Sequence, residues 1–239
     1  MQVLKIPGGG NFQFSAVKPA NLGASDYTLV TIACDISGSV EPFSKELLEA
    51  VKAVVRACQK NPRSENLMLR LLSFNDTVYE VHGFLPLNSI NADDYKALKC
   101  GGMTALYDSV FSAVGATLTY SESLISQDFD VNGAVYIITD GADNSSAETR
   151  KSIAKQLAKA KQSEVIESLI SVLVGVNTKD GDCQIYLEDF KNEAGLTQYV
   201  DIGDATPQKL AKLGGWVSKS ISSQSQALGT GCPSQSLTF

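Results

Sequence analysis

The sequence predicts an α/β fold with a doubly wound, mostly parallel central sheet, helices on both faces and one antiparallel edge strand. Two observations support this prediction. Short apolar runs rich in β-branched residues alternate with helical patterns from about residue 28 to residue 225. The composition is that of an ordinary globular chain, with 44% apolar and 19% charged residues. Because no linker interrupts the alternation, we expect one domain.

The first half of the pattern contains three strands and one helix. Residues 28–33 (TLVTIA) form a short apolar run that predicts a strand buried on both faces. Apolar residues recur at helical spacing over 41–60, where a proline at the second position suits a first helical turn. Residues 67–74 and 78–84 have the pattern of two strands joined by the turn Asn75-Asp76. The second of them is the predicted antiparallel edge strand.

The second half continues the alternation to the end of the predicted domain. We expect helices over 105–118, 148–162, 185–194 and 207–220, and strands over 134–139, 169–176 and 198–202. The last helix has a clear start, because Thr206 is a good N-cap and Pro207 suits the first helical position. Both ends of the chain are rich in glycine, serine and glutamine. We therefore predict an N-terminal arm over 1–24, a domain over 25–221 and a C-terminal tail over 222–239.

Composition and targeting signals exclude several classes of function. The chain has 26 acidic and 20 basic residues and a net charge of −6, so it lacks the basic surface of a nucleic-acid-binding protein. No apolar run is long enough for a membrane span or a secretory signal, so we expect a cytoplasmic location away from membranes. The only histidine, His82, excludes most catalytic triads and multi-histidine metal sites.

The cysteines predict free thiols in a reducing compartment. Their number is odd, their spacing is wide, and no Cys-x-x-Cys motif is present. This pattern argues against a disulfide framework and against a thiolate zinc site. The five residues concerned are Cys34, Cys58, Cys100, Cys183 and Cys232.

Polar side chains gather in three loops next to the predicted strands and helices. Asp35, Ser37 and Ser39 come directly after the first buried strand, and Asp140 directly after the first strand of the second half. Thr104 lies in a glycine-containing loop just before a predicted helix. Ligands of open α/β sheets bind outside the carboxyl ends of the strands, so we expect these five side chains to meet there.

Two carboxylates and three hydroxyls are the hard oxygen ligands that suit Mg²⁺ or Ca²⁺ rather than Zn²⁺. The three hydroxyls are neutral, so this set offers only two anionic ligands to the cation. Mg²⁺ also commonly keeps a position for a ligand from outside the protein. We therefore expect the metal to bridge to an Asp or Glu side chain of a partner protein.

The motif Asp35-x-Ser37-x-Ser39, then Thr104, then Asp140-Gly141, resembles the metal-ion-dependent adhesion site of von Willebrand factor A domains. The resemblance covers about residues 27–220, and the residues beside Thr104 and Asp140 look more like those of bacterial intracellular members of that family than like those of integrin inserts. It implies a Rossmann-like fold and a complete metal site that holds Mg²⁺ or Mn²⁺. In this family the three hydroxyls bind the ion and the two aspartates hold it directly or through water. The resemblance therefore implies a non-enzymatic module that captures an acidic side chain of a partner.

Other interpretations of the same residues stay open. Ser37 and Ser39 taken alone suit helix caps, and Asp140-Gly141 alone suits a turn. Asp35 could serve as the nucleophile of a metal-dependent phosphohydrolase, although Ser37 stands where haloacid-dehalogenase-like enzymes have a second aspartate. A third interpretation is an accessory subunit of an AAA-type ATPase, or of a kinase or phosphatase cassette, which changes only the partner. The chain itself has no glycine-rich nucleotide-binding motif.

Overall fold

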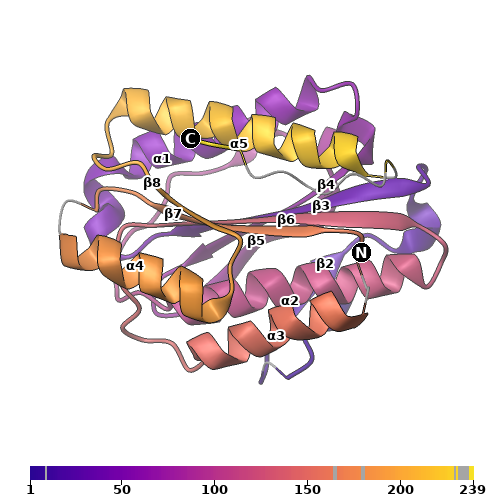
Figure 1. Ribbon diagram of the computed structural model, residues 1–239. Helices are drawn as coiled ribbons and strands as arrows, with labels where there is room; N and C mark the ends of the chain where they lie inside the picture. The colour runs from indigo at the N-terminus through magenta and orange to yellow at the C-terminus, as the bar shows by residue number, and fades with distance from the viewer. Residues whose placement is uncertain (9, 164–165, 179–180, 229, 231–236) are drawn as a thin grey trace.

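The computed structural model describes residues 1–239 apart from 9, 164–165, 179–180, 229 and 231–236. Within these residues one eight-stranded sheet runs through the molecule in the order β1-β2-β5-β4-β3-β6-β7-β8. Helices cover both faces of this sheet (Figure 1). The predicted doubly wound, mostly parallel α/β fold is confirmed.

Five parallel strands form most of the sheet. They are β3 (Asp26–Asp35), β4 (Leu67–Phe74), β6 (Asp130–Thr139), β7 (Leu169–Gly175) and β8 (Gln198–Asp201). Nearly every residue of β3 and β6 is buried, which explains why their sequences are continuous apolar runs and do not alternate. The register places Val30 of β3 between Leu69 of β4 and Ala134 of β6. The carboxyl ends of β3 and β6 therefore lie side by side.

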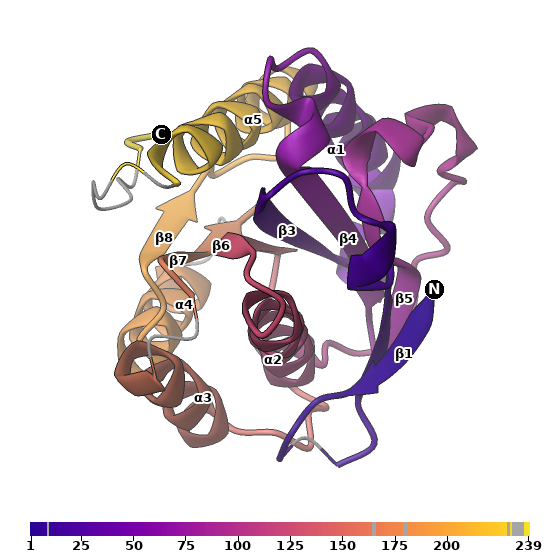
Figure 2. The same ribbon diagram turned by 90° about the vertical axis from the view of Figure 1, so that its right-hand side faces the viewer.

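The helices form one layer on each face of the sheet. One layer contains α1 (Ser44–Gln59) and α5 (Pro207–Ala227), and the other contains α2 (Leu106–Ile125), α3 (Arg150–Ser163) and α4 (Gly181–Ala194) (Figure 1, Figure 2). Each layer buries its own cluster of apolar side chains against the sheet. The helices α1 and α5 come close at Gly214, where a Cβ atom would lie 3.1 Å from the backbone oxygen of Ala50.

The sheet extends further at one edge than the sequence indicates. The strand β5 (Val78–Pro86) is antiparallel to β4, as expected, but two more strands lie beyond it. The strand β2 (Gln13–Ala16) is parallel to β5, and β1 (Gln2–Lys5) is antiparallel to β2. Much of the N-terminal segment that we expected to form an arm thus belongs to the sheet. These strands have four residues each, which is too short for alternation to distinguish them from a loop.

An ion pair between the buried Arg70 and the half-buried Glu80 joins β2 to its neighbours. The Arg70 side chain is 1% exposed, and its Nε donates to Glu80 Oε2 at 2.8 Å. The same guanidinium also donates to the backbone oxygen and the hydroxyl of Ser112 in α2. The other oxygen of Glu80 accepts hydrogen bonds from the N–H and the hydroxyl of Ser15, at 2.9 and 2.6 Å. Both charges therefore have partners, which offsets the cost of burying them.

The last residues of the chain return to the domain. The ring of Phe239 packs against Trp216 of α5 with ring centroids 6.0 Å apart. The Gln198 amide donates to the backbone oxygen of Leu237 at 3.1 Å. Cys232, for which we predict a free thiol, lies outside the described residues. None of the helices in the described ranges combines the length and the hydropathy that a membrane crossing requires.

Candidate metal site

The five predicted site residues come to the same end of the sheet. Asp35 is the last residue of β3, and Asp140 directly follows β6, its parallel neighbour. Ser37 lies in the loop after β3, and Ser39 lies in the 3₁₀ turn Gly38–Phe43 that follows. Thr104 lies in the loop before α2. This is the carboxyl end of the parallel strands, where ligands of open α/β sheets bind.

Hydrogen bonds join four of these residues in a line from the core to the surface. The Ser37 N–H donates to Asp35 Oδ1 at 2.7 Å, and the Ser37 and Ser39 hydroxyl oxygens are 3.1 Å apart. The Ser39 hydroxyl donates to Asp140 Oδ1 at 2.9 Å. Asp35 and Ser37 are buried, Asp140 is half-buried, and Ser39 is exposed. The cluster therefore opens to solvent on the side of Ser39 and Asp140.

The backbone of Thr104 is clamped by Asn144 from the loop after β6. The Thr104 N–H donates to Asn144 Oδ1 at 2.7 Å, and the Asn144 N–H donates to the Thr104 backbone oxygen at 3.0 Å. On the other side, the Gly38 N–H donates to the Gly102 oxygen at 3.3 Å and joins this loop to the serine loop. The Thr104 hydroxyl makes no hydrogen bond within the described part of the chain. It is thus held in place by its backbone and left open to a ligand.

Gly102 is required for the tight path of the threonine loop. Its φ is +81°, and a Cβ atom there would lie 2.0 Å from Asp76 Oδ2. Asp76 also accepts a hydrogen bond from the Met103 N–H at 3.1 Å. A side chain at position 102 would be strained at this φ and would force the Asp76 carboxylate to move.

Burial disfavours the charged form of both site carboxylates. It raises the pKa of Asp35 from 3.8 to about 6, although hydrogen bonds from Thr139 and Ser37 act to lower it. The charge of Asp140 adds to the increase. Burial also raises the pKa of Asp140, against the hydrogen bond from Ser39. Two carboxylates are therefore held together at one partly buried site. A cation bound between them would offset the free-energy cost of their negative charges.

The spacing of the oxygens fits a small octahedral cation. Ligands about 2.0–2.1 Å from Mg²⁺ in an octahedron lie about 2.9 Å from their neighbours. The two contacts of Ser39, 3.1 Å to Ser37 Oγ and 2.9 Å to Asp140 Oδ1, are hydrogen bonds of ordinary length, and their oxygens are about as far apart as neighbouring ligands of such a cation. Among the described residues no group of three or more His, Cys, Asp or Glu side chains is placed to hold a metal ion. A metal at this site therefore depends on the hydroxyls as well as on the two aspartates.

Three residues that support the site were not among the predicted ones. The Thr139 hydroxyl donates to Asp35 Oδ2 at 2.7 Å and fixes the carboxylate from behind. Asn144 clamps Thr104, and the backbone oxygen of Asn75 accepts the Ala105 N–H at 2.6 Å. Thr139 and Asn144 flank the predicted Asp140 in sequence. That proximity is the one signal in the sequence that could have pointed to them.

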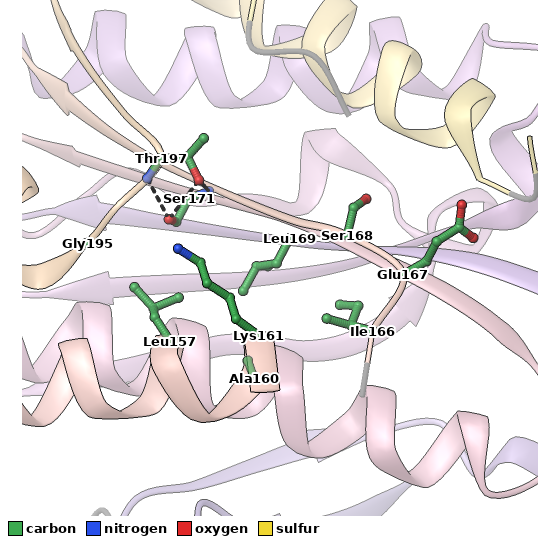
Figure 3. A pocket seen from close by; sticks show the side chains of 10 residues that line it. All are labelled: Leu157, Ala160, Lys161, Ile166, Glu167, Ser168, Leu169, Ser171, Gly195 and Thr197. Carbon is green, nitrogen blue, oxygen red and sulfur yellow. Dashed lines mark hydrogen bonds between the residues drawn. The ribbon is translucent and has the colours of Figure 1, made fainter. Parts of the chain in front are cut away.

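A separate pocket lies at the opposite end of the sheet. Figure 3 shows this hollow of about 470 Å³ beside the start of β7, between α3 and the segment that leads to β8. Its polar lining includes Ser171 and Thr197, whose hydroxyl oxygens are 3.3 Å apart. Because it opens near the amino end of β7, it is not part of the candidate metal site.

No protein-family model and no curated protein matches this sequence, but solved structures share its fold. A mutant of the PilB minor pilin from Streptococcus sanguinis aligns with a TM-score of 0.58 and 13% identity over 87% of this chain. The pilus adhesin SpaC from Lactobacillus rhamnosus GG aligns with a TM-score of 0.56 and 12% identity over 84%. The structure of proximal thread matrix protein 1 from the mussel byssus, with a zinc-occupied MIDAS motif, aligns with a TM-score of 0.56 and 19% identity over 83% of this chain. This chain has their fold.

The similar proteins are longer than this chain. The aligned region covers 64% of the pilin, 31% of the adhesin and 46% of the mussel protein. The identities are low, so the comparison establishes the fold alone.

Proposed function

We propose that this chain is a metal-dependent protein-interaction module that does not act as an enzyme. Mg²⁺ or Mn²⁺ is held by hydroxyl and carboxylate oxygens and binds an Asp or Glu side chain of a partner protein. The residues that hold the ion are Asp35, Ser37, Ser39, Thr104 and Asp140. The observation that carries the proposal is the convergence of these residues at the carboxyl ends of β3 and β6, where hydrogen bonds join four of them.

The coordination of the site leaves room for an acidic partner. Asp35 and Asp140 formally balance the charge of a divalent ion, and five protein ligands leave one of the six octahedral positions for a carboxylate from outside. Ser39 is exposed and Asp140 half-buried, so a carboxylate from another molecule can approach on that side. A charge-assisted contact of this kind is stronger than one between neutral groups. The net charge of −6 opposes an acidic partner only at long range, where salt screens it.

Burial of Asp35 supports binding and not catalysis. The residue is 0% exposed, and both of its carboxylate oxygens accept hydrogen bonds, from Ser37 and Thr139. A nucleophile for phosphoryl transfer must reach its substrate. The only histidine, His82, lies on β5 and not in the candidate site, and its ring stacks on Tyr95 with the ring centroids 5.8 Å apart.

Bacterial origin and cytoplasmic location stay predictions from the sequence.

The metal is tested by comparing Asp140→Ala with Asp130→Ala. Asp130 is an exposed carboxylate at the opposite end of the same strand, so it controls for loss of charge. A ligand that binds only the folded state at a hundredfold excess over its Kd stabilises by about 2.7 kcal/mol. We expect MgCl₂ to raise the melting temperature of the wild type and of Asp130→Ala, and to raise that of Asp140→Ala far less. Equal responses of all three to MgCl₂ and to chelator would contradict the proposal.

The acidic partner is tested by binding to a partner protein with and without metal. A protein captured from native lysate in MgCl₂ is identified, purified and titrated against the wild type. We expect its affinity to fall in chelator and when its own contacting Asp or Glu is changed to Asn or Gln. An affinity unchanged by chelator would show that the partner binds elsewhere on the surface.

A further inference from the structure

A groove of about 500 Å³ lies beside the candidate metal site, over β4 and β5. Ile36 and Asn75 form the wall of the groove that is nearest to the candidate metal site. Ile36 belongs to the loop Asp35–Ser39, and the Asn75 side chain donates to the backbone oxygen of Gly101 at 2.8 Å. The groove is therefore continuous with the two loops that carry the candidate metal ligands. Its volume lies in the range of ligand-binding clefts.

The groove presents large apolar side chains to solvent. Tyr79 and Val81, which are separated by one residue on β5, are each 50% exposed. They line the groove together with Leu98. Solvent-facing positions of an antiparallel strand are ordinarily polar. Met103, 51% exposed, lies nearby, because its N–H donates to Asp76 in the turn between β4 and β5. Clustered apolar side chains that stay in water mark surfaces that contact another molecule.

The rim of the groove carries two lysines without acidic partners. Lys96 and Lys99 are exposed, and neither forms an ion pair with any residue that the structure describes. One acid, Asp94, lies on the same rim. The molecule as a whole has a net charge of −6, so this basic rim is a local exception. It complements a ligand that has acidic residues next to its apolar ones.

We infer that the partner of the candidate metal site is an extended acidic-apolar peptide segment that occupies this groove. An Asp or Glu of the segment binds the metal, a neighbouring aromatic or large aliphatic side chain packs on Tyr79 and Val81, and a further acidic residue faces Lys96 and Lys99. This inference rests on the proposed function, because the metal anchors the first carboxylate. Carboxylates are common on protein surfaces, so the metal alone selects little. The groove adds the selectivity.

The test uses a phage-displayed library of random dodecapeptides, selected on the immobilised full chain in MgCl₂. We expect the selected peptides to combine Asp or Glu with a neighbouring Trp, Tyr, Phe or Leu. A synthetic copy of the strongest binder is then titrated against variants. The double variant Tyr79→Ser/Val81→Ser should bind about tenfold more weakly or worse. Lys96→Gln/Lys99→Gln should lose about threefold, and this loss should disappear at high salt.

Ile185→Ser is the matched control. Ile185 is 63% exposed on α4, which packs near β7 and β8, across the metal site from the groove. We expect this variant to bind the peptide like the wild type. Melting temperatures with and without MgCl₂ check that every variant is folded and still responds to metal. A groove variant that responds to metal but has lost the peptide supports the inference directly.

The possible failures are distinguishable. One outcome is that metal-dependent peptides bind the groove variants as tightly as the wild type, or lose affinity for Ile185→Ser instead. Either result would overturn the inference and leave the proposed function intact. Another outcome is that peptide affinity falls in the groove variants but does not change in chelator. That result would overturn the metal anchor and with it the proposed function. A selection that enriches no peptide, or only peptides without an acidic residue, would also count against the inference.

Discussion

Replacing Asp35 by asparagine should stabilise the metal-free protein while abolishing its response to metal. The carboxylate is fully buried, and its pKa is raised from 3.8 to about 6. Asparagine has the same shape and no charge. Its carbonyl can accept the Ser37 N–H, and its amide can donate to Thr139 Oγ1 in place of the bond that Thr139 now donates. The Thr139 hydroxyl can then donate to the backbone oxygen of Gly141, which is already 3.2 Å away.

The size of the effect follows from the pKa of Asp35. At about 1.36 kcal/mol per pH unit, the rise from 3.8 to about 6 means that the ionised carboxylate costs the metal-free fold about 3 kcal/mol at pH 7. This pKa already includes the hydrogen bonds from Thr139 and Ser37, which act to lower it. We therefore expect Asp35→Asn to gain up to about 3 kcal/mol at pH 7 in chelator. The wild type gains about 2.7 kcal/mol at a hundredfold excess of Mg²⁺ over Kd, and the variant gains none.

The dependence on pH has a definite sign. A pKa that is raised in the folded state adds stability below pH 3.8, and this contribution is lost as the pH rises through about 6. Other carboxylates titrate in the same range, so the difference between wild type and Asp35→Asn isolates Asp35. Urea unfolding of both proteins from pH 4 to pH 7, in chelator and in MgCl₂, measures this difference. A variant that is less stable than the wild type in chelator at pH 7, or a difference that does not change with pH, would refute the reasoning.

Three further predictions follow from the same geometry. Thr104→Ala should bind Mg²⁺ at least about tenfold more weakly by calorimetry, with little change in melting temperature, because its hydroxyl makes no hydrogen bond in the described chain. Asn144→Ala should weaken Mg²⁺ binding by about 10–100-fold, since it frees the Thr104 backbone; affinity equal to wild type would refute the clamp. Burial raises the pKa of the Cys34 and Cys58 thiols to about 12, so iodoacetamide at neutral pH should leave both unlabelled until the protein is unfolded, as peptide mass spectrometry would show.

The central strands could be predicted because burial on both faces leaves a local signature. Residues 67–74 were predicted with the bounds that the structure gives β4, since apolar runs of this length are typical of doubly covered strands. The helix α2 is longer than predicted and ends at Ile125. Its last turns contain polar residues that the fold nevertheless buries. Tyr120, for example, donates its hydroxyl to the backbone oxygen of Val17 at 2.7 Å. Such a partner lies far away in sequence, so no local pattern reveals it.

The candidate site was partly predictable for a related reason. Asp35 ends a buried strand, Ser37 lies two residues after it and Asp140 directly follows another buried strand, so the geometry of parallel sheets brings them together. Their role as metal ligands stays a prediction. Asn75 and Asn144 support the threonine loop through contacts between separate loops. These contacts depend on how three loops pack, which the sequence of any one loop does not determine.

The N-terminal hairpin determines how the sheet ends. The strand β2 pairs with β5 around Ala16 and Phe84, and without it this stretch of β5 would present unpaired N–H and C=O groups, which are a template for pairing with another chain. Glu80 would also lose both hydrogen bonds from Ser15, beside the buried Arg70. The edge that β1 provides instead is only four residues long and carries Lys5, and short charged edges resist such pairing. A chain shortened to begin after Val17 should therefore keep the residues of the metal site and yet self-associate.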